Sequence, residues 1–371
     1  MSDALKSLTD AGTSIWLDDL SRTRLDSGNL AQLMGERSVR GVTTNPSIFE
    51  KAISGSADAY AADLRACATA GLGVDATIRR LTTDDVRRAC DLLMGIYTAS
   101  QGVDGRVSIE VDPRLAHDTE GTVAQAHELW KLVDRPNLLI KIPATVAGLP
   151  AITAVIGAGI SVNVTLIFSV ERYREVVLAY MAGLRRAADN GLHLGSIHSV
   201  ASVFVSRVDG MVDPMLDAIG SELATELRGA AAIANARLVW AAYREISADG
   251  EWQQLLAAGA NAQRPLWAST GVKDHRYDDT RYVIELAVPG SVNTVPEATL
   301  QAVFDHGSFG GDTVTPNLEA AQGLWAQLET LGIGRTAVCD KLEADGVRQF
   351  IEAWERLRST VEVAIAAARA Q

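Results

Sequence analysis

The sequence predicts an α/β fold, because short runs rich in β-branched residues alternate along the chain with longer helical patterns. Each βα unit adds a parallel strand, and eight units close a (β/α)8 TIM barrel, here with extra helices. The expected helices include Thr82–Ser100, Thr119–Val133 and Val170–Ala188, the last with Ser169 as its N-cap. The expected strands are Ser14–Asp19, Gly41–Asn45, Val107–Asp112, Leu138–Pro143, Ser161–Phe168, Ser196–Val205, Pro265–Ser269 and, for the eighth, either Tyr282–Leu286 or Val292–Val295.

An open, doubly wound sheet is the structural alternative to a closed barrel. Such a sheet normally carries a glycine-rich phosphate loop after its first strand. Here the first strand runs into Leu17-Asp18-Asp19-Leu20-Ser21, which contains no glycine. The missing loop favours the barrel.

Two regions exceed the length of a minimal barrel. Residues 221–263 are alanine-rich and predict a helical insertion of two or three helices after the sixth strand. Residues 341–370 predict a long C-terminal helix that closes the fold. No repeat, low-complexity linker or break in composition divides the chain. We therefore expect residues 1–371 to form a single elaborated domain.

Composition excludes several classes of function. The 371 residues carry a net charge of -12 and no run of Lys or Arg, which argues against a nucleic-acid surface. No apolar run approaches membrane-spanning length. The three scattered cysteines and six scattered histidines show no metal-ligand spacing, so no metal and no cofactor are expected. These features are typical of a cytoplasmic protein with reduced thiols.

Polar residues recur in one phase of the predicted strands. Side chains alternate along a strand, and in a barrel one phase faces the interior. Lys141, for example, opposes Ile140 and Ile142. The residues expected to converge at the barrel mouth are Asp18, Thr43, Asn45, Glu110, Lys141, Asn163, Thr165 and Ser269. A structural ion pair between Lys141 and Glu110 is the alternative, but it leaves the polar ends of the other strands unexplained.

This set of groups favours chemistry on the lysine amine. A lysine surrounded by hydrogen-bonding groups can form a Schiff base with a ketone. Asp18 suits the base that cleaves a carbon–carbon bond, and Glu110 with Thr165 could hold a proton-shuttling water. Serine hydrolysis lacks a GxSxG elbow, glycoside hydrolysis leaves Lys141 unused, and metal hydrolysis lacks a histidine cluster.

Five segments in order also resemble the transaldolase family, in its longer bacterial form within the class I Schiff-base aldolases. They cover most of the predicted strands, and the ordered set is far more specific than any single motif. The segments are Val42–Ser47 (VTTNPS), Ser108–Leu115 (SIEVDPRL), Leu139–Thr145 (LIKIPAT), Gly159–Ser169 (GISVNVTLIFS) and Trp267–Lys273 (WASTGVK), with Val292–Pro296 (VNTVP) after them.

The resemblance implies a role for each site residue. Lys141 forms the imine, Asp18 is the acid/base for bond cleavage, and Glu110 with Thr165 positions the catalytic water. The dihydroxyacetone unit and the phosphate are bound by Thr43, Asn45, Asn163, Ser202, Phe204, Arg207 and Ser269. The implied reaction belongs to the non-oxidative pentose phosphate pathway. It converts sedoheptulose 7-phosphate and glyceraldehyde 3-phosphate into erythrose 4-phosphate and fructose 6-phosphate.

The chain departs from the shorter family members at the phosphate site. The position of their second phosphate arginine is Gly271 here, so we expect Lys273 to supply that charge. Val288–Ser291 also differs from the expected glycine-proline stretch. The implied partners are phosphorylated ketoses and aldoses. The sequence leaves the oligomeric state undecided, and an oligomer is possible. A stand-alone aldolase that releases dihydroxyacetone, and a sugar-phosphate-binding barrel without activity, are the two other functions considered.

Overall fold

The computed structural model describes residues 4–370, and its eight strands close into one parallel barrel in the order β1 to β8. The prediction of a (β/α)8 barrel with extra helices is therefore confirmed. The strands are β1 Ser14–Leu17, β2 Val39–Val42, β3 Arg106–Glu110, β4 Leu138–Pro143, β5 Val162–Ile167, β6 Ser199–Phe204, β7 Gln263–Ala268 and β8 Val292–Val295.

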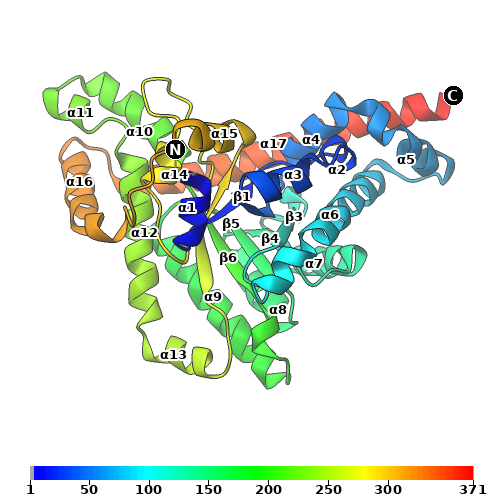
Figure 1. The fold of residues 1–371 in the computed structure, drawn as a ribbon, viewed down its shortest axis with the longest axis horizontal. Coiled ribbons are helices and arrows are strands. Elements are labelled where there is room, and N and C mark those ends of the chain that lie inside the picture. The colour runs from blue at the N-terminus through cyan, green and yellow to red at the C-terminus, as the bar shows by residue number, and fades with distance from the viewer. Residues whose placement is uncertain (1–3, 371) are drawn as a thin grey trace.

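Helices surround this barrel and cover one of its ends (Figure 1). The α-helices are α1 Ala4–Asp10, α2 Arg22–Asp26, α3 Asn29–Glu36, α4 Pro46–Gly55, α5 Ala57–Thr69, α6 Val74–Ala99, α7 Thr119–Val133, α8 Gly148–Gly157, α9 Val170–Asp189, α10 Ser206–Ile219, α11 Glu222–Glu226, α12 Ala231–Ser247, α13 Gly250–Ala257, α14 Arg281–Ile284, α15 Glu297–His306, α16 Leu318–Thr330 and α17 Arg335–Ala370. The short 3-10 helices are η1 Pro113–Leu115, η2 Leu194–Ser196 and η3 Thr315–Asn317.

The predicted element ends needed several corrections. Of the two candidates for the eighth strand, Val292–Val295 is right, and Tyr282–Leu286 is wrong because α14 occupies most of it. The helix predicted over Thr82–Ser100 begins earlier, at Val74. The prediction missed its first turns because they are too polar to show a clear apolar stripe. Ser169 is the N-cap of α9, as predicted, and its hydroxyl accepts from the Arg172 N–H at 2.9 Å.

The two regions beyond a minimal barrel lie in different places. Residues 221–263 contain α11, α12 and α13, and α12 packs against α9 and β7. The C-terminal helix α17 starts at Arg335 and crosses the end of the barrel, with its last part beside α4 and α5 (Figure 1). The single-domain assignment stays a prediction. Within residues 4–370 no helix combines the length and apolar character that a membrane span requires.

The register of the strands puts the site residues side by side. Glu110 on β3 is level with Lys141 on β4, and Lys141 is level with Asn163 on β5. One strand breaks the expected alternation, because Leu166 has a left-handed φ of 61° and the β5–β6 register shifts beside it. Strict alternation would put Leu166 on the outer face with Val164, but its side chain lies against Gly346 of α17.

Trp16 fills the barrel interior below the site. Its side chain is fully buried, and its indole Nε1 donates to Asp104 at 3.0 Å. The ring lies directly over Gly41 of β2, where an added Cβ would come within 2.6 Å of ring carbons. Gly41 is therefore required by the close approach of a large ring, and Trp16 is a packing residue.

We expect Gly41→Ala to lower the free energy of unfolding by about 1–3 kcal/mol, because the methyl group overpacks the indole. Gly95→Ala in α6 is the matched control, since nothing lies within 4 Å of its added Cβ. That change should leave stability unchanged or raise it by up to about 1 kcal/mol. Denaturant and thermal midpoints measure both, and equal midpoints for the two variants would contradict the packing of Trp16 on Gly41.

Candidate active site

A cavity of about 350 Å³ opens at the carboxyl ends of the strands, where barrel enzymes carry their active sites. Most of the residues predicted from sequence meet there: Asp18, Thr43, Asn45, Lys141, Thr165, Ser202, Phe204, Arg207, Ser269 and Lys273. Five further residues line it: Ser47, Lys51, Ala268, Thr294 and Phe350. Glu110 and Asn163 are not on its wall.

Lys141 is the cation at the base of this cavity. It is only 5% exposed, and its Nζ donates to the Thr44 carbonyl oxygen at 3.1 Å. The same Nζ lies 3.6 Å from Glu110 Oε2 and 5.5 Å from the centroid of the Phe350 ring. The ammonium group is thus held by a carbonyl, a carboxylate and an aromatic face.

Glu110 lies between β3 and Lys141 and is almost completely buried. Burial raises the pKa of its carboxyl to about 7, although the nearby Lys141 charge opposes the rise. Its Oε2 has no hydrogen-bond partner among the described residues. A carboxyl in this position can hold or release a proton near neutral pH, which is what acid/base work requires.

Asp18 and Asp19 are neighbours in the chain with different environments. Asp18 lines the cavity and accepts from the Thr43 hydroxyl at 2.7 Å. Burial raises its pKa, while Lys141 and the Thr43 hydrogen bond oppose the rise. Asp19 is directed elsewhere and forms an ion pair with Arg24 at 2.6 Å. Only Asp18 of the two can act on a molecule in the cavity.

Asn163 lies beneath the cavity floor. It is fully buried, its amide nitrogen donates to Ser108 at 3.0 Å, and its oxygen accepts from Ser202 at 2.6 Å. The sequence predicted it among the inward groups, and the structure shows its amide holding Ser202, which does line the cavity. Thr165 also faces the cavity, and its hydroxyl has no partner within residues 4–370.

The other side of the cavity is positively charged. Arg207 lies 5.1 Å from the Phe204 ring centroid, and its Nη1 is buried without a hydrogen-bond partner in the described chain. Burial and the Arg207 charge both lower the pKa of Lys273, so the two cations are near one another. Ser269, with a left-handed φ of 56°, is within 3.0 Å of the Ser206 hydroxyl. Neither cation has an ion-pair partner in residues 4–370, so the pair is available for an anion.

The loop that carries Lys273 is anchored to α10. The Tyr277 hydroxyl donates to Asp213 at 2.6 Å, and the Tyr282 hydroxyl donates to Asp209 at 2.6 Å. The same aspartates accept backbone N–H groups just before and within the first turn of α12. These bonds fix the position of the loop relative to the helix that follows β6.

The sequence reasoning missed four polar or aromatic residues of the cavity. Ser47 and Lys51 are one helical turn apart on α4, so the motif around Asn45 could have pointed to them. The Thr294 hydroxyl lies 2.6 Å from that of Thr43, over the strand β1 between them, but its strand was uncertain from sequence. Phe350 comes from α17, and no local pattern indicates that this helix crosses the strand ends.

Acidic side chains near the site are engaged in ion pairs or are scattered. Arg114 pairs with Asp112 at 2.5 Å. Among residues 4–370, no cluster of three or more His, Cys, Asp or Glu side chains is arranged to hold a metal ion.

These features define a barrel enzyme whose buried lysine and carboxyls face a polar cavity with a cationic end, an arrangement suited to carbonyl chemistry on an anionic substrate. The model of the transaldolase/fructose-6-phosphate aldolase family matches residues 15–361. This chain belongs to that family.

Curated relatives match nearly the whole chain. Transaldolase 1 of Streptomyces coelicolor is 59% identical over 358 residues, which is 96% of this chain and 94% of the relative. The transaldolase of Mycobacterium tuberculosis strain CDC 1551 is 60% identical over 354 residues, or 95% of each chain. The transaldolase of Thermobifida fusca is 55% identical over 367 residues, covering 99% of this chain and 100% of the relative.

Proposed function

We propose that the protein is a transaldolase that carries a dihydroxyacetone unit as a Schiff base on Lys141. Family membership makes it a transferase. The observation that carries the residue assignment is the buried Lys141 amine, 3.6 Å from Glu110 at the base of a polar cavity. Substrate binding needs no nucleophile in that position, whereas imine formation does.

The reaction follows from the positions of three groups. The neutral amine of Lys141 attacks the ketose C2, and Glu110 gives a proton to the departing hydroxyl, so water leaves and an iminium forms. Asp18 then takes the proton of the C4 hydroxyl, the C3–C4 bond breaks, and the aldehyde departs. The enamine left on Lys141 attacks a second aldehyde, and the same steps run in reverse.

The remaining cavity residues hold the sugar. Thr43, Asn45 and Ser202 bind hydroxyls of the three-carbon unit, with Asn163 orienting Ser202 from below. Phe204 covers the unit, and Thr165 shares the catalytic water with Glu110; the unpartnered atoms of both residues support this pairing. Arg207, Ser269 and Lys273 bind the phosphate, which matches the unpaired positive end of the cavity.

The proposed exchange joins sedoheptulose 7-phosphate and glyceraldehyde 3-phosphate to erythrose 4-phosphate and fructose 6-phosphate. Phosphorylated ketoses and aldoses are thus the partners in the reaction. Location in the cytoplasm belongs to the same proposal, because Cys67, Cys90 and Cys339 are buried free thiols.

Lys141→Arg should abolish turnover of fructose 6-phosphate with erythrose 4-phosphate, because arginine stays protonated and cannot form the imine. The coupled release of glyceraldehyde 3-phosphate measures the loss. Free dihydroxyacetone from the unmodified enzyme, formed at the rate of aldehyde release, would make it an aldolase instead. Appreciable turnover by the arginine variant would remove Lys141 from the mechanism.

Asp18→Asn should lower kcat by roughly 10² to 10⁴, the range typical of a lost acid/base group. Asp19→Asn is the matched control, and it should be mild because it removes only the partly exposed ion pair with Arg24. Steady-state kinetics of both variants makes the comparison. Similar losses at the two positions would mean that Asp18 is not the group facing the substrate.

Lys273→Ala should raise KM for fructose 6-phosphate about tenfold or more, since hydrogen bonds to charged groups contribute about 1.5–3 kcal/mol. Turnover of unphosphorylated fructose should hardly change. An added Cβ at Gly271 would lie 3.1 Å from Pro296 Cγ, so that position offers little room for a second arginine.

Arg276→Ala, in the same loop, is the control for Lys273, because Arg276 is engaged with Asp274 at 2.7 Å and is largely exposed. It should leave both donors unaffected. Equal effects of Lys273→Ala on the phosphorylated and the unphosphorylated donor would refute a phosphate role for Lys273.

A further inference from the structure

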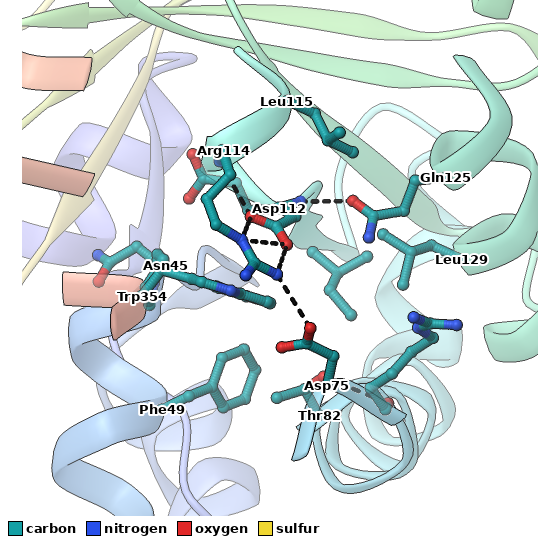
Figure 2. A pocket seen from close by; sticks show the side chains of 14 residues that line it. Asn45, Phe49, Asp75, Thr82, Asp112, Arg114, Leu115, Gln125, Leu129 and Trp354 are labelled. Atoms are coloured by element: carbon teal, nitrogen blue, oxygen red, sulfur yellow. Dashed lines mark hydrogen bonds and ion pairs between the residues drawn. The ribbon is translucent and has the colours of Figure 1, made fainter. Parts of the chain in front are cut away.

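A second cavity, of about 210 Å³, lies on the other side of Glu110 (Figure 2). Its walls come from α4, α6, α7, the end of β3 with η1, and α17. Asn45 is the only residue that it shares with the cavity that holds Lys141. Glu110 lines the second cavity but not the cavity that holds Lys141. Its carboxyl therefore lies between the second cavity and the Lys141 amine.

Two residues in its wall each carry a buried polar atom without a hydrogen-bond partner in the described chain. One atom is the acceptor Glu110 Oε2, whose ion pair with Lys141 spans 3.6 Å, and the other is the donor Trp354 Nε1. Buried polar atoms are normally satisfied, and where protein groups are absent ordered water satisfies them. Since a water occupies about 30 Å³ in the liquid, the cavity has room for several. Asn45 and Gln125 share the wall with apolar side chains, so water in the cavity has polar partners.

The rim of this cavity is closed by ion pairs. Arg114 contacts Asp75 at 3.1 Å, and Arg358 of α17 contacts the same carboxylate at 2.8 Å. Figure 2 shows Arg114 between Asp112 and Asp75. The Asp75, Arg114 and Arg358 side chains are partly exposed, and Glu355 joins both arginines in the same network. Water from the solvent therefore meets this rim without passing the substrate cavity.

From this geometry we infer that the second cavity is the water compartment of the Schiff-base reaction, an inference that rests on the proposed function. One water must leave when the carbinolamine becomes an iminium: Glu110 gives its proton to the C2 hydroxyl, the C–O bond breaks, and the nitrogen lone pair forms the C=N bond. One water must return to hydrolyse the product imine, and its proton goes back to Glu110. Both waters pass through the second cavity, on the side of Glu110 that faces away from the Lys141 amine.

The substrate cavity is a poor route for the same water. During these steps the sugar phosphate occupies its roughly 350 Å³, beneath Phe204 and Phe350. The Phe350 ring lies over both Lys141 and Arg207, so α17 covers part of this cavity. A rear compartment lets water exchange while sugar fills the substrate cavity.

The test measures how fast oxygen-18 from labelled water enters the C2 carbonyl of fructose 6-phosphate, since each imine formed and hydrolysed exchanges that oxygen. Two variants fill the cavity from different walls, Leu115→Trp from η1 and Leu129→Phe from α7. The matched control is Leu132→Trp, because Leu132 is on α7 but 40% exposed to solvent. Mass spectrometry gives the exchange rate, and thermal midpoints identify folded variants.

We expect the filled variants to lose about tenfold in both oxygen exchange and kcat, with KM for the sugar nearly unchanged. The loss should stay below the roughly 10² to 10⁴ typical of removing an acid/base group, because Glu110 itself remains. Undiminished exchange in either variant, folded with an unchanged midpoint, overturns the inference. No enzyme-dependent exchange in the unmodified protein would instead overturn the Schiff-base function.

Discussion

The contact between the Lys141 ammonium and the Glu110 carboxyl, 3.6 Å apart on adjacent strands, is the constraint on which the rest of the site depends. Neither group is stable alone in a barrel interior, because an unpaired buried charge loses several kcal/mol of hydration. In this pair the Glu110 carboxyl can hold or release a proton near neutral pH, since burial raises its pKa to about 7. The barrel register, which sets the two residues level, therefore places side by side the amine and the carboxyl that the proposed reaction needs.

The same pair divides the space above the strands into two compartments. On the Lys141 side the walls are polar and end in the cations Arg207 and Lys273, which suits a phosphorylated sugar. On the Glu110 side the space is small, and its rim is made of ion pairs. Helix α17 covers both, with Phe350 over the amine and Trp354 in the second cavity. One helix distant in sequence thus closes the substrate space and the water space.

Strand periodicity was enough to predict the barrel and the inward-facing groups on its strands, because side chains alternate between the two faces of a strand. Ser202, Phe204 and Arg207 came from the family resemblance instead. Strand periodicity failed where the chain leaves that rule, as at Leu166, whose positive φ turns it toward α17. Strand periodicity placed Asn163 inside the barrel. It could not predict that the Asn163 amide forms hydrogen bonds with Ser108 and Ser202. The position of Phe350 in the cavity could not be predicted from sequence, since the path of α17 is set by tertiary packing and no local pattern encodes it.

The central claim is that one lysine forms the covalent intermediate. The most direct test incubates the protein with fructose 6-phosphate, reduces it with borohydride and maps the modified peptide by mass spectrometry. We expect a reduced dihydroxyacetone adduct on Lys141 and on no other lysine, because within residues 4–370 the other two lysines of the cavity, Lys51 and Lys273, form no ion pair with a carboxylate. An adduct on Lys273, or no adduct under conditions of full turnover, would contradict it.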